Sequence, residues 1–355
     1  MSYAIGSDNL MLVFSQDKNV QECFSVKSDM AAMIAFEKAL TSALARCDVI
    51  SLKDAQEIIN VLENFEPDMD QIQIEFKRDA VVPPVLVKQI RKKLNDEYQA
   101  GFHHGTTSQD LIDTSLMMRM KDSVAIVSRN LKILELKLKE LAASHSDERI
   151  LTARTRMQNA LPISVPEKIG NWRSQIESLL ISMPQTFLLQ LGGPEGAARE
   201  YGANYHDISS TMASILELTP PKHAWHTDRQ QLTSICFWFT QVATAMGKIS
   251  QDLLFMAQSD VAEVRLEGGG SSSAMKHKKN PVLAEVILAQ AQYCHTQMSG
   301  LNTASIHENE RSGTAWTLEW MLVPSLLITS ANTVVNTTEL ILSLIHISEP
   351  TRRRG

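Results

Sequence analysis

The sequence predicts an all-α protein built from long helices, and three observations carry that prediction. Only 15 of the 355 residues are glycine and 12 are proline, about 4% and 3% where soluble proteins average about 7% and 5%, which disfavours turn-dense β folds. Two stretches of about 25 residues place apolar side chains at alternating spacings of three and four, and alternation with a period of two is scarce. We expect a central bundle of long helices over residues 106–345, preceded by a smaller helical domain over residues 1–105.

The N-terminal hundred residues have the pattern of shorter helices. Pro67 and the pair Pro83 and Pro84 interrupt them, because proline ends or kinks a helix. The boundary to the central bundle is predicted near Gly105.

The central region begins with the first long apolar run, residues 116–141, and the second covers residues 232–256. At 1.5 Å per residue each helix would extend roughly 38 Å, which predicts rods packed side by side. A third helix is expected over residues 166–187, with a kink at Pro184.

Two further helices are expected after residues 281 and 317. Asn280 is predicted to cap the first of them and Pro281 to be its first helical residue. The segment 346–355 ends in a proline and three arginines and offers no apolar face. We expect it to be a disordered terminus or an artificial or read-through remnant.

Composition excludes several classes of function. The net charge is −6, so no bulk basic surface for nucleic acid is expected. No run of about 18 consecutive apolar residues and no basic start before an apolar block is found, so we expect neither a membrane span nor export. The four cysteines form no C-x-x-C pair, which favours reduced thiols in a cytoplasmic protein.

Three polar segments interrupt the helical pattern, and we expect them in loops or at helix starts. They are HHGTTSQD at 103–110, RTRMQNALP at 154–162 and GGGSSSAMKHKKNP at 268–281. They carry hydroxyls, amides and cations and lack the carboxylate pairs of glycosidases and the His/Cys clusters of metal sites. The predicted ligand is therefore an anion, with no metal.

The third polar segment has competing interpretations when taken alone. Ser273 and Lys276 form the S-x-x-K string of β-lactamases, and an S-D-N string begins at Ser7. However, the strings come in the wrong order, K-T-G is absent and strand patterns are scarce. A phosphate-binding P-loop is not matched, and a solvated linker would not explain cations and an asparagine gathered before a helix start.

The third polar segment closely resembles the G-S-S-x-M-P-x-K-x-N-P signature of the fumarase/aspartase superfamily. The other two segments resemble its first and second signature regions, and the resemblance covers about residues 20–345. It implies the fold of that superfamily, a homotetramer whose sites combine three subunits, and no cofactor. It also implies a small third helical domain, for which this chain has no room.

The second polar segment indicates the branch. Adenylosuccinate lyases have R-T-H there, where the histidine protonates a leaving amine, whereas this sequence has Arg156. Arginine does not transfer protons at neutral pH, but a carboxylate leaving group needs none. The 3-carboxy-cis,cis-muconate cycloisomerase branch has this lactonising chemistry, and PKHAWHTDRQ at 221–230 and ERSGTAWTLEW at 310–320 resemble it. The alternatives are an adenylosuccinate-type lyase releasing fumarate and a catalytically silent scaffold.

The resemblance assigns roles to particular residues. Ser272, with Ser273 as a neighbour able to exchange roles, would transfer a proton at the carbon next to a carboxylate. A tricarboxylate substrate would be bound by His104, Thr107, Ser108, Arg154, Thr155, Arg156, Gln158, Lys278, Asn280 and Arg311.

Structural interpretations of the same residues stay open. Asn280, Thr107, Ser108 and Asp110 could simply cap helices, and Arg156 could form a surface salt bridge. His223 and His226 form an H-x-x-H string with no carboxylate ligand to complete a metal site, which favours packing or substrate lining. The signature itself departs at Ser271, where glycine is usual, and at Lys276, where proline is usual.

Overall fold

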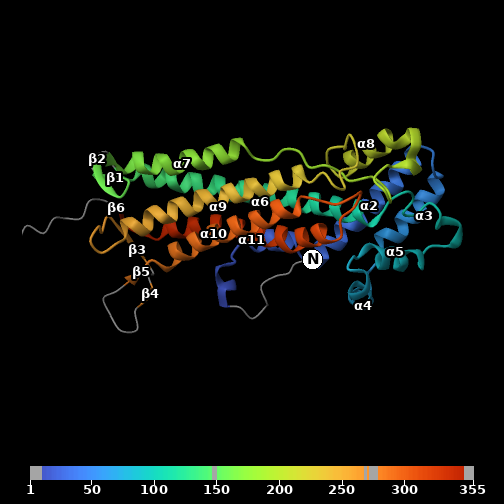
Figure 1. The fold of residues 1–355 in the computed structure, drawn as a ribbon, viewed down its shortest axis with the longest axis horizontal. Coiled ribbons are helices and arrows are strands. Elements are labelled where there is room, and N and C mark those ends of the chain that lie inside the picture. Colours follow the sequence, from blue (N-terminus) through green and yellow to red (C-terminus); the bar gives the residue numbers. More distant parts are fainter. Residues whose placement is uncertain (1–9, 146–149, 268–269, 272–278, 348–355) are drawn as a thin grey trace, which may run out of the picture.

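The computed structural model describes residues 10–145, 150–267, 270–271 and 279–347, and long helices dominate these residues (Figure 1). Five rods run along the molecule: α6 (Ser108–Ala143), α7 (Val165–Ile181), α9 (Gln230–Met256), α10 (Val282–Ala304) and α11 (Thr314–Leu342). The two long apolar runs of the sequence coincide with α6 and α9, which confirms the predicted all-α fold.

One apolar core fills the bundle along its length. From Leu116 to Leu138 every turn of α6 contributes a buried residue, such as Val127, Leu131 and Leu134. The same core takes Ile249 from α9 and Val334 from α11. Periodic apolar residues therefore form the bundle for the reason the sequence suggested, because they bury one stripe of each rod.

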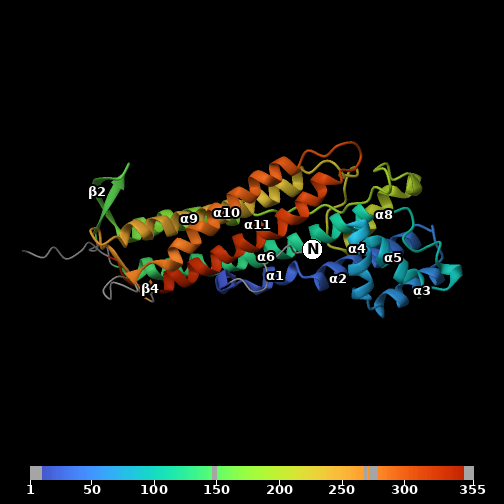
Figure 2. The same cartoon turned by 60° about the horizontal axis from the view of Figure 1, so that its bottom comes forward.

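A second group of helices, most of them short, forms a head at one end of the bundle (Figure 2). They are α2 (Val26–Arg46), α3 (Leu52–Glu63), α4 (Met69–Asp79), α5 (Pro83–Arg91) and α8 (Tyr205–Ile215). A second core joins α2 and α5 to the segment 189–213 and to Trp316 of α11. The short α1 (Lys18–Cys23) instead packs Val20 and Phe24 into the bundle core. The head core thus draws on three separate stretches of chain, and the division at residue 105 stays a prediction.

Three details differ from the sequence-based expectations. Helix α7 ends at Ile181, so Pro184 follows the helix and does not kink it, since the residue before a proline is disfavoured in helical conformation. Helix α10 begins at Val282 with Pro281 as its N-cap and no side-chain cap. Asn280 is not the cap because it lies in an extended strand, β5 (Lys279–Asn280), paired with β4 (Gly270–Ser271).

The second polar segment forms a hairpin that the sequence analysis did not predict. β1 (Ile150–Thr155) pairs antiparallel with β2 (Gln158–Ser164), and the two-residue turn places Arg156 at φ 48° and Met157 at φ 67°. Two positive φ angles define a type I′ turn, for which Asn-Gly is the usual sequence signal. Arg-Met lacks that signal, so the hairpin was missed.

The expected lack of a packing face beyond residue 345 is also wrong in part. β6 (Leu344–Ile347) pairs antiparallel with β3 (Val264–Leu266), and Ile347 is only 1% exposed. β6 is only four residues long, and such a short apolar run directly after a helix does not distinguish a strand from the end of the helix.

Helix α11 is the one helix of the described residues that is long and apolar enough to cross a membrane by length and composition. More than half of its most apolar stretch, 56%, is buried inside the protein. It packs against α6, α9 and α10, so its apolar character is accounted for by its place at the centre of the bundle.

The α6 core can be tested with a matched pair of leucines. Leu134 is fully buried and Leu136 is 50% exposed, so Leu134→Ala should lower the free energy of unfolding by about 2–5 kcal/mol. Leu136→Ala should change it by less than about 0.5 kcal/mol. Urea unfolding followed by circular dichroism measures both, and equal losses would contradict the orientation of α6.

Candidate active site

The first polar segment is organised by the buried carboxylate of Asp110, in the first turn of α6. Its side chain is fully buried, and its oxygens bond to three separate segments. The groups within 2.8–3.1 Å are the backbone N–H of Thr107, Gly192 and Gly193, the hydroxyl of Thr106 and Nε2 of His226. Asp110 therefore joins the start of α6 to the loops at residues 192–193 and 226.

Glycine is required at residue 192 for this approach. A Cβ there would lie 2.6 Å from the Cβ of Ala224 and 2.9 Å from Cε1 of His226, closer than side chains allow. A small residue thus lets the loop bring its N–H groups to Asp110.

Arg311 reaches the same place from the loop before α11. Its Nη2 donates to Oγ1 of Thr107 and to the carbonyl oxygen of Pro194, both at 3.0 Å. Its Nε is buried and has no hydrogen-bond partner among the described residues. His104 and Ser108 are partly buried beside Thr107 in the chain. The structure brings Thr107 and Arg311 together, and a free guanidinium N–H suits an anionic group.

Near Asp110 lies a fully buried ionic cluster for which the sequence predicted no role. Arg229 donates to both oxygens of Asp113, at 2.7 and 3.1 Å, and to both of Glu319, at 2.9 and 2.6 Å. Trp316 Nε1 donates to Asp113 at 3.1 Å, and Nε2 of His307 lies 3.1 Å from Glu319. We call Asp113, Arg229, His307, Trp316 and Glu319 the Arg229 cluster.

The Arg229 cluster explains the two strings singled out at 221–230 and 310–320. The first supplies Arg229, and the second supplies Trp316 and Glu319. Burial by itself would raise the pKa of Asp113, but the Arg229 guanidinium outweighs it and holds that pKa below its ordinary value. The sequence signal for this cluster was the presence of both an H-T-D-R string and a W-T-L-E string. Their contact is formed only in the folded chain.

His226 is a packing residue, consistent with one of the two interpretations of the H-x-x-H string. It is buried and contacts Asp110, whereas His223 is exposed. Among the residues that the structure describes, no group of three or more His, Cys, Asp or Glu side chains could hold a metal.

The second polar segment lies in the β1–β2 hairpin. Arg154 donates to both oxygens of the buried Glu263, at 2.9 Å each, and this bond raises the pKa of the Arg154 guanidinium. Thr155, Arg156 and Gln158 are exposed around the turn. Within the described ranges Arg156 forms no ion pair, so the surface salt bridge considered for it is not found there, while Arg154 forms one.

The third polar segment is described only at its edges. Ser272, Ser273 and Lys278 lie outside the described residues, as does Lys276. Asn280 is described, partly buried, with its backbone in the β4–β5 pair. Their proposed roles stay predictions.

The first and second segments do not meet within one chain. The first precedes α6 and the second follows it, and 36 helical residues at 1.5 Å each separate them by about 54 Å. Figure 1 shows the β1–β2 hairpin and β3–β6 at the end of the bundle opposite the head. A single substrate of a few ångströms contacts both ends only if another chain supplies one of them.

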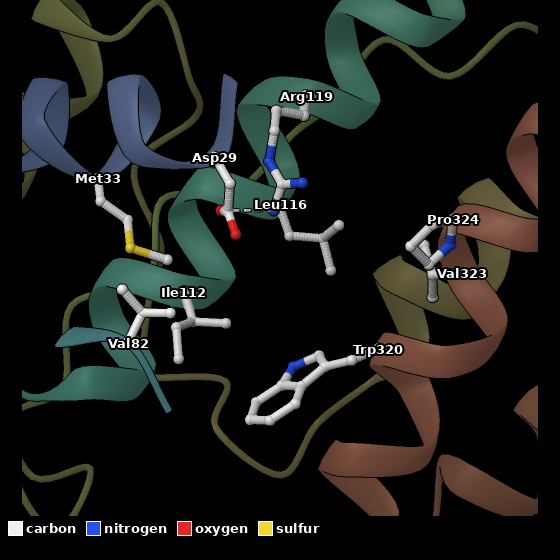
Figure 3. A pocket seen from close by; sticks show the side chains of 9 residues that line it. All are labelled: Asp29, Met33, Val82, Ile112, Leu116, Arg119, Trp320, Val323 and Pro324. Atoms are coloured by element: carbon white, nitrogen blue, oxygen red, sulfur yellow. Dashed lines mark ion pairs between the residues drawn. The ribbon is translucent and has the colours of Figure 1, made fainter. Parts of the chain in front are cut away.

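A small cavity elsewhere is unrelated to these segments. It lies between α2, α6 and α11, where Trp320 faces the Asp29–Arg119 ion pair across apolar side chains (Figure 3). Its volume of 30 Å³ is room for a water molecule or two. None of the predicted site residues lines it.

Comparison with known proteins defines the class. A family model described as a lyase matches residues 1–294, and the chain belongs to this lyase family, within the fumarase/aspartase superfamily. The resemblance seen in the three polar segments is thereby confirmed, and the protein is a lyase-type enzyme.

The individual relatives narrow the comparison. The chain is 27% identical over 339 residues to the 3-carboxy-cis,cis-muconate cycloisomerase of Acinetobacter baylyi, covering 91% of this chain and 74% of the relative. It is 29% identical over 315 residues to the enzyme of that name from Pseudomonas aeruginosa, covering 85% and 68%. The structure of a fumarate lyase from Mesorhizobium sp. BNC1 superposes with a TM-score of 0.85 at 25% identity, covering 94% and 76%.

The Arg229 cluster should dominate local stability. Arg229→Met leaves two buried carboxylates without their cation and should lower the free energy of unfolding at pH 7 by about 3–5 kcal/mol. In the wild type the depressed pKa of Asp113 contributes stability that is present above its unfolded pKa of about 3.9 and is lost as pH falls through the folded pKa. The difference between variant and wild type should therefore shrink below about pH 4.

Urea unfolding at a series of pH values and one protein concentration measures this difference. Arg173→Met is the matched control, because Arg173 pairs with Glu135 at the surface and should cost at most about 1 kcal/mol. A difference that stays constant from pH 7 to pH 3 would rule out the proposed role of the cluster.

Proposed function

We propose that this enzyme is a 3-carboxy-cis,cis-muconate cycloisomerase, converting its tricarboxylate substrate to 4-carboxymuconolactone without a cofactor in the protocatechuate branch of the β-ketoadipate pathway. We expect it to act in the cytoplasm as a homotetramer. The observation that carries the proposal is Arg156, which stands exposed at the turn of the β1–β2 hairpin, free of any carboxylate among the described residues.

Arg156 supports lactonisation because its side chain does not transfer protons at neutral pH. A guanidinium stays charged at neutral pH and cannot donate a proton to a leaving amine. It can bind a carboxylate through two parallel N–H groups. A reaction in which a carboxylate oxygen is the nucleophile or leaving group, such as cycloisomerisation, is compatible with such a residue.

The proposed step balances with one proton. A carboxylate oxygen of the trianionic substrate adds to a ring-forming carbon of the diene, and the π electrons move to the carbon beside another carboxylate. That aci-carboxylate carbon then takes a proton through Ser272, and a dianionic lactone results. Cations and N–H groups around the developing charge lower the barrier, and Arg156, Arg311 and Lys278 are the candidates.

The length of the rods supports a site that is shared between subunits. Thr107 and Arg311 lie at the head, whereas Arg156 lies beyond the other end of α6. We therefore expect the first segment of one subunit to meet the second and third segments of its neighbours. In this proposal the monomer has no complete site.

The function is tested by mixing the purified full-length enzyme with 3-carboxy-cis,cis-muconate and following ultraviolet absorbance. We expect loss of the muconate chromophore, no activity in Ser272→Ala, and a 10- to 100-fold lower kcat/KM in Arg156→Met, about the value of one charged hydrogen bond. Arg129→Met is the control, since Arg129 is exposed on α6. An unchanged spectrum from an assembled tetramer would refute the proposal, and fumarate release from adenylosuccinate would favour the lyase alternative.

Subunit sharing is tested by mixing two variants that are each expected to have reduced activity. Arg156→Met and Arg311→Met chains, dissociated in dilute urea and reassembled together, should recover part of the wild-type activity, because some sites receive neither substitution. Each variant reassembled alone gives the baseline. No recovery in mixed oligomers confirmed by native mass spectrometry would show that each chain forms its own site.

A further inference from the structure

A large cavity lies under the β1–β2 hairpin and contains groups that the proposed reaction does not use. It has a volume of 530 Å³ and is bounded by the hairpin, the first turns of α7 and the last turns of α9. The bidentate bond from Arg154 to Glu263 holds the hairpin over the end of α9. The cavity is therefore bounded by regular elements that are tied to one another.

Its lining carries more positive than negative charge. Four cations, Arg154, Arg156, Lys168 and Lys248, face two carboxylates, Asp252 and Glu263. Four positive and two negative side chains give the described lining a net formal charge of +2. Among the residues that the structure describes, no third acid lines the cavity, so its lining favours an anion.

Both carboxylates are already occupied by protein groups. Lys168 Nζ lies 2.8 Å from Asp252, and Lys248 and the indole N–H of Trp172 contact the same carboxylate. Burial would raise the pKa of Asp252, but the bonds from Lys168 and Lys248 hold it below its ordinary value. Asp252 therefore stays ionised near neutral pH, and both carboxylates are bound by protein cations.

Lys168 and Lys248 each have N–H donors in addition to the one directed toward Asp252. An ammonium group has three N–H bonds, and each lysine directs one toward Asp252, with side-chain exposures of 24% for Lys168 and 50% for Lys248. Asn171 and Gln258 add neutral amide donors, while Phe255 contributes an apolar wall. Charged donors beside an apolar wall suit carboxylates joined by a short carbon chain better than a compact inorganic ion.

We propose that this cavity is a binding site for a small organic dianion, such as a four- or five-carbon dicarboxylate, held by Lys168, Lys248 and Arg156. The site lies within one chain, between its own hairpin and helices. It rests on the proposed function through Arg156, which a bound dianion would draw inward from the hairpin turn, and it also includes Arg154, which the sequence predicts to bind the substrate. A ligand here would thus control whether Arg156 is available to the proposed reaction.

Calorimetric titration of the full-length protein with succinate tests the site without any turnover. We expect one succinate per chain with affinity weakened by added salt, and at least tenfold weaker binding in Lys168→Gln and in Lys248→Gln. Lys168→Arg should retain binding. Lys121→Gln is the matched control, because Lys121 is a partly exposed lysine paired with Glu217 far from the cavity.

Titrations of two further variants distinguish this site from the proposed catalytic site. Ser272→Ala and Arg311→Met should bind succinate as the wild type does, and a tenfold loss in either would place the ligand in the catalytic site and overturn the proposal. Inorganic phosphate binding as tightly as succinate would overturn the choice of an organic dianion. Succinate binding that survives a failed muconate assay would contradict the proposed function alone.

Discussion

The Arg229 cluster is the interaction on which the candidate site depends. One guanidinium forms ion pairs with Asp113 from α6 and Glu319 from α11 at zero exposure, where an unpaired charge would cost several kilocalories per mole. Because these three groups must meet, the start of α9 is fixed against α6 and α11. Asp110, one turn before Asp113, then gathers the loop at residues 192–193 and the backbone of Thr107.

This arrangement gives rigid support to groups that face outward. Arg311 and Thr107 contact each other in front of the buried cluster, so neither has to be ordered when an anion binds. Preorganised donors lose little freedom on binding and so act more effectively on developing charge. The head end thus supplies a prepared half of an anion site, while the hairpin end supplies exposed Arg156 on a strained turn.

The rods impose a separation that shapes every functional hypothesis. α6 places the two halves about 54 Å apart, and apolar packing along its whole length prevents it from bending to close that distance. The proposed sharing of the site and the proposed ligand cavity under the hairpin both rest on long, straight helices. The cavity belongs to a single chain because α7 and α9 lie next to the hairpin that joins α6 to α7.

The sequence by itself determined the rods and the superfamily, and it predicts an anionic ligand. Apolar spacing gave α6 and α9 because the period of a helix is local, and the three polar segments indicated an anion and the superfamily because motifs are local too. Only the tertiary structure decided the Arg229 cluster, the bond between Arg311 and Thr107, and the pairing of Asn280 in a strand in place of a helix cap. Those depend on residues as much as 204 positions apart, and the hairpin turn at Arg156 depends on a backbone conformation that its residues do not favour. Local periodicity carries no information about which distant charges will be buried together, so folding alone supplies it.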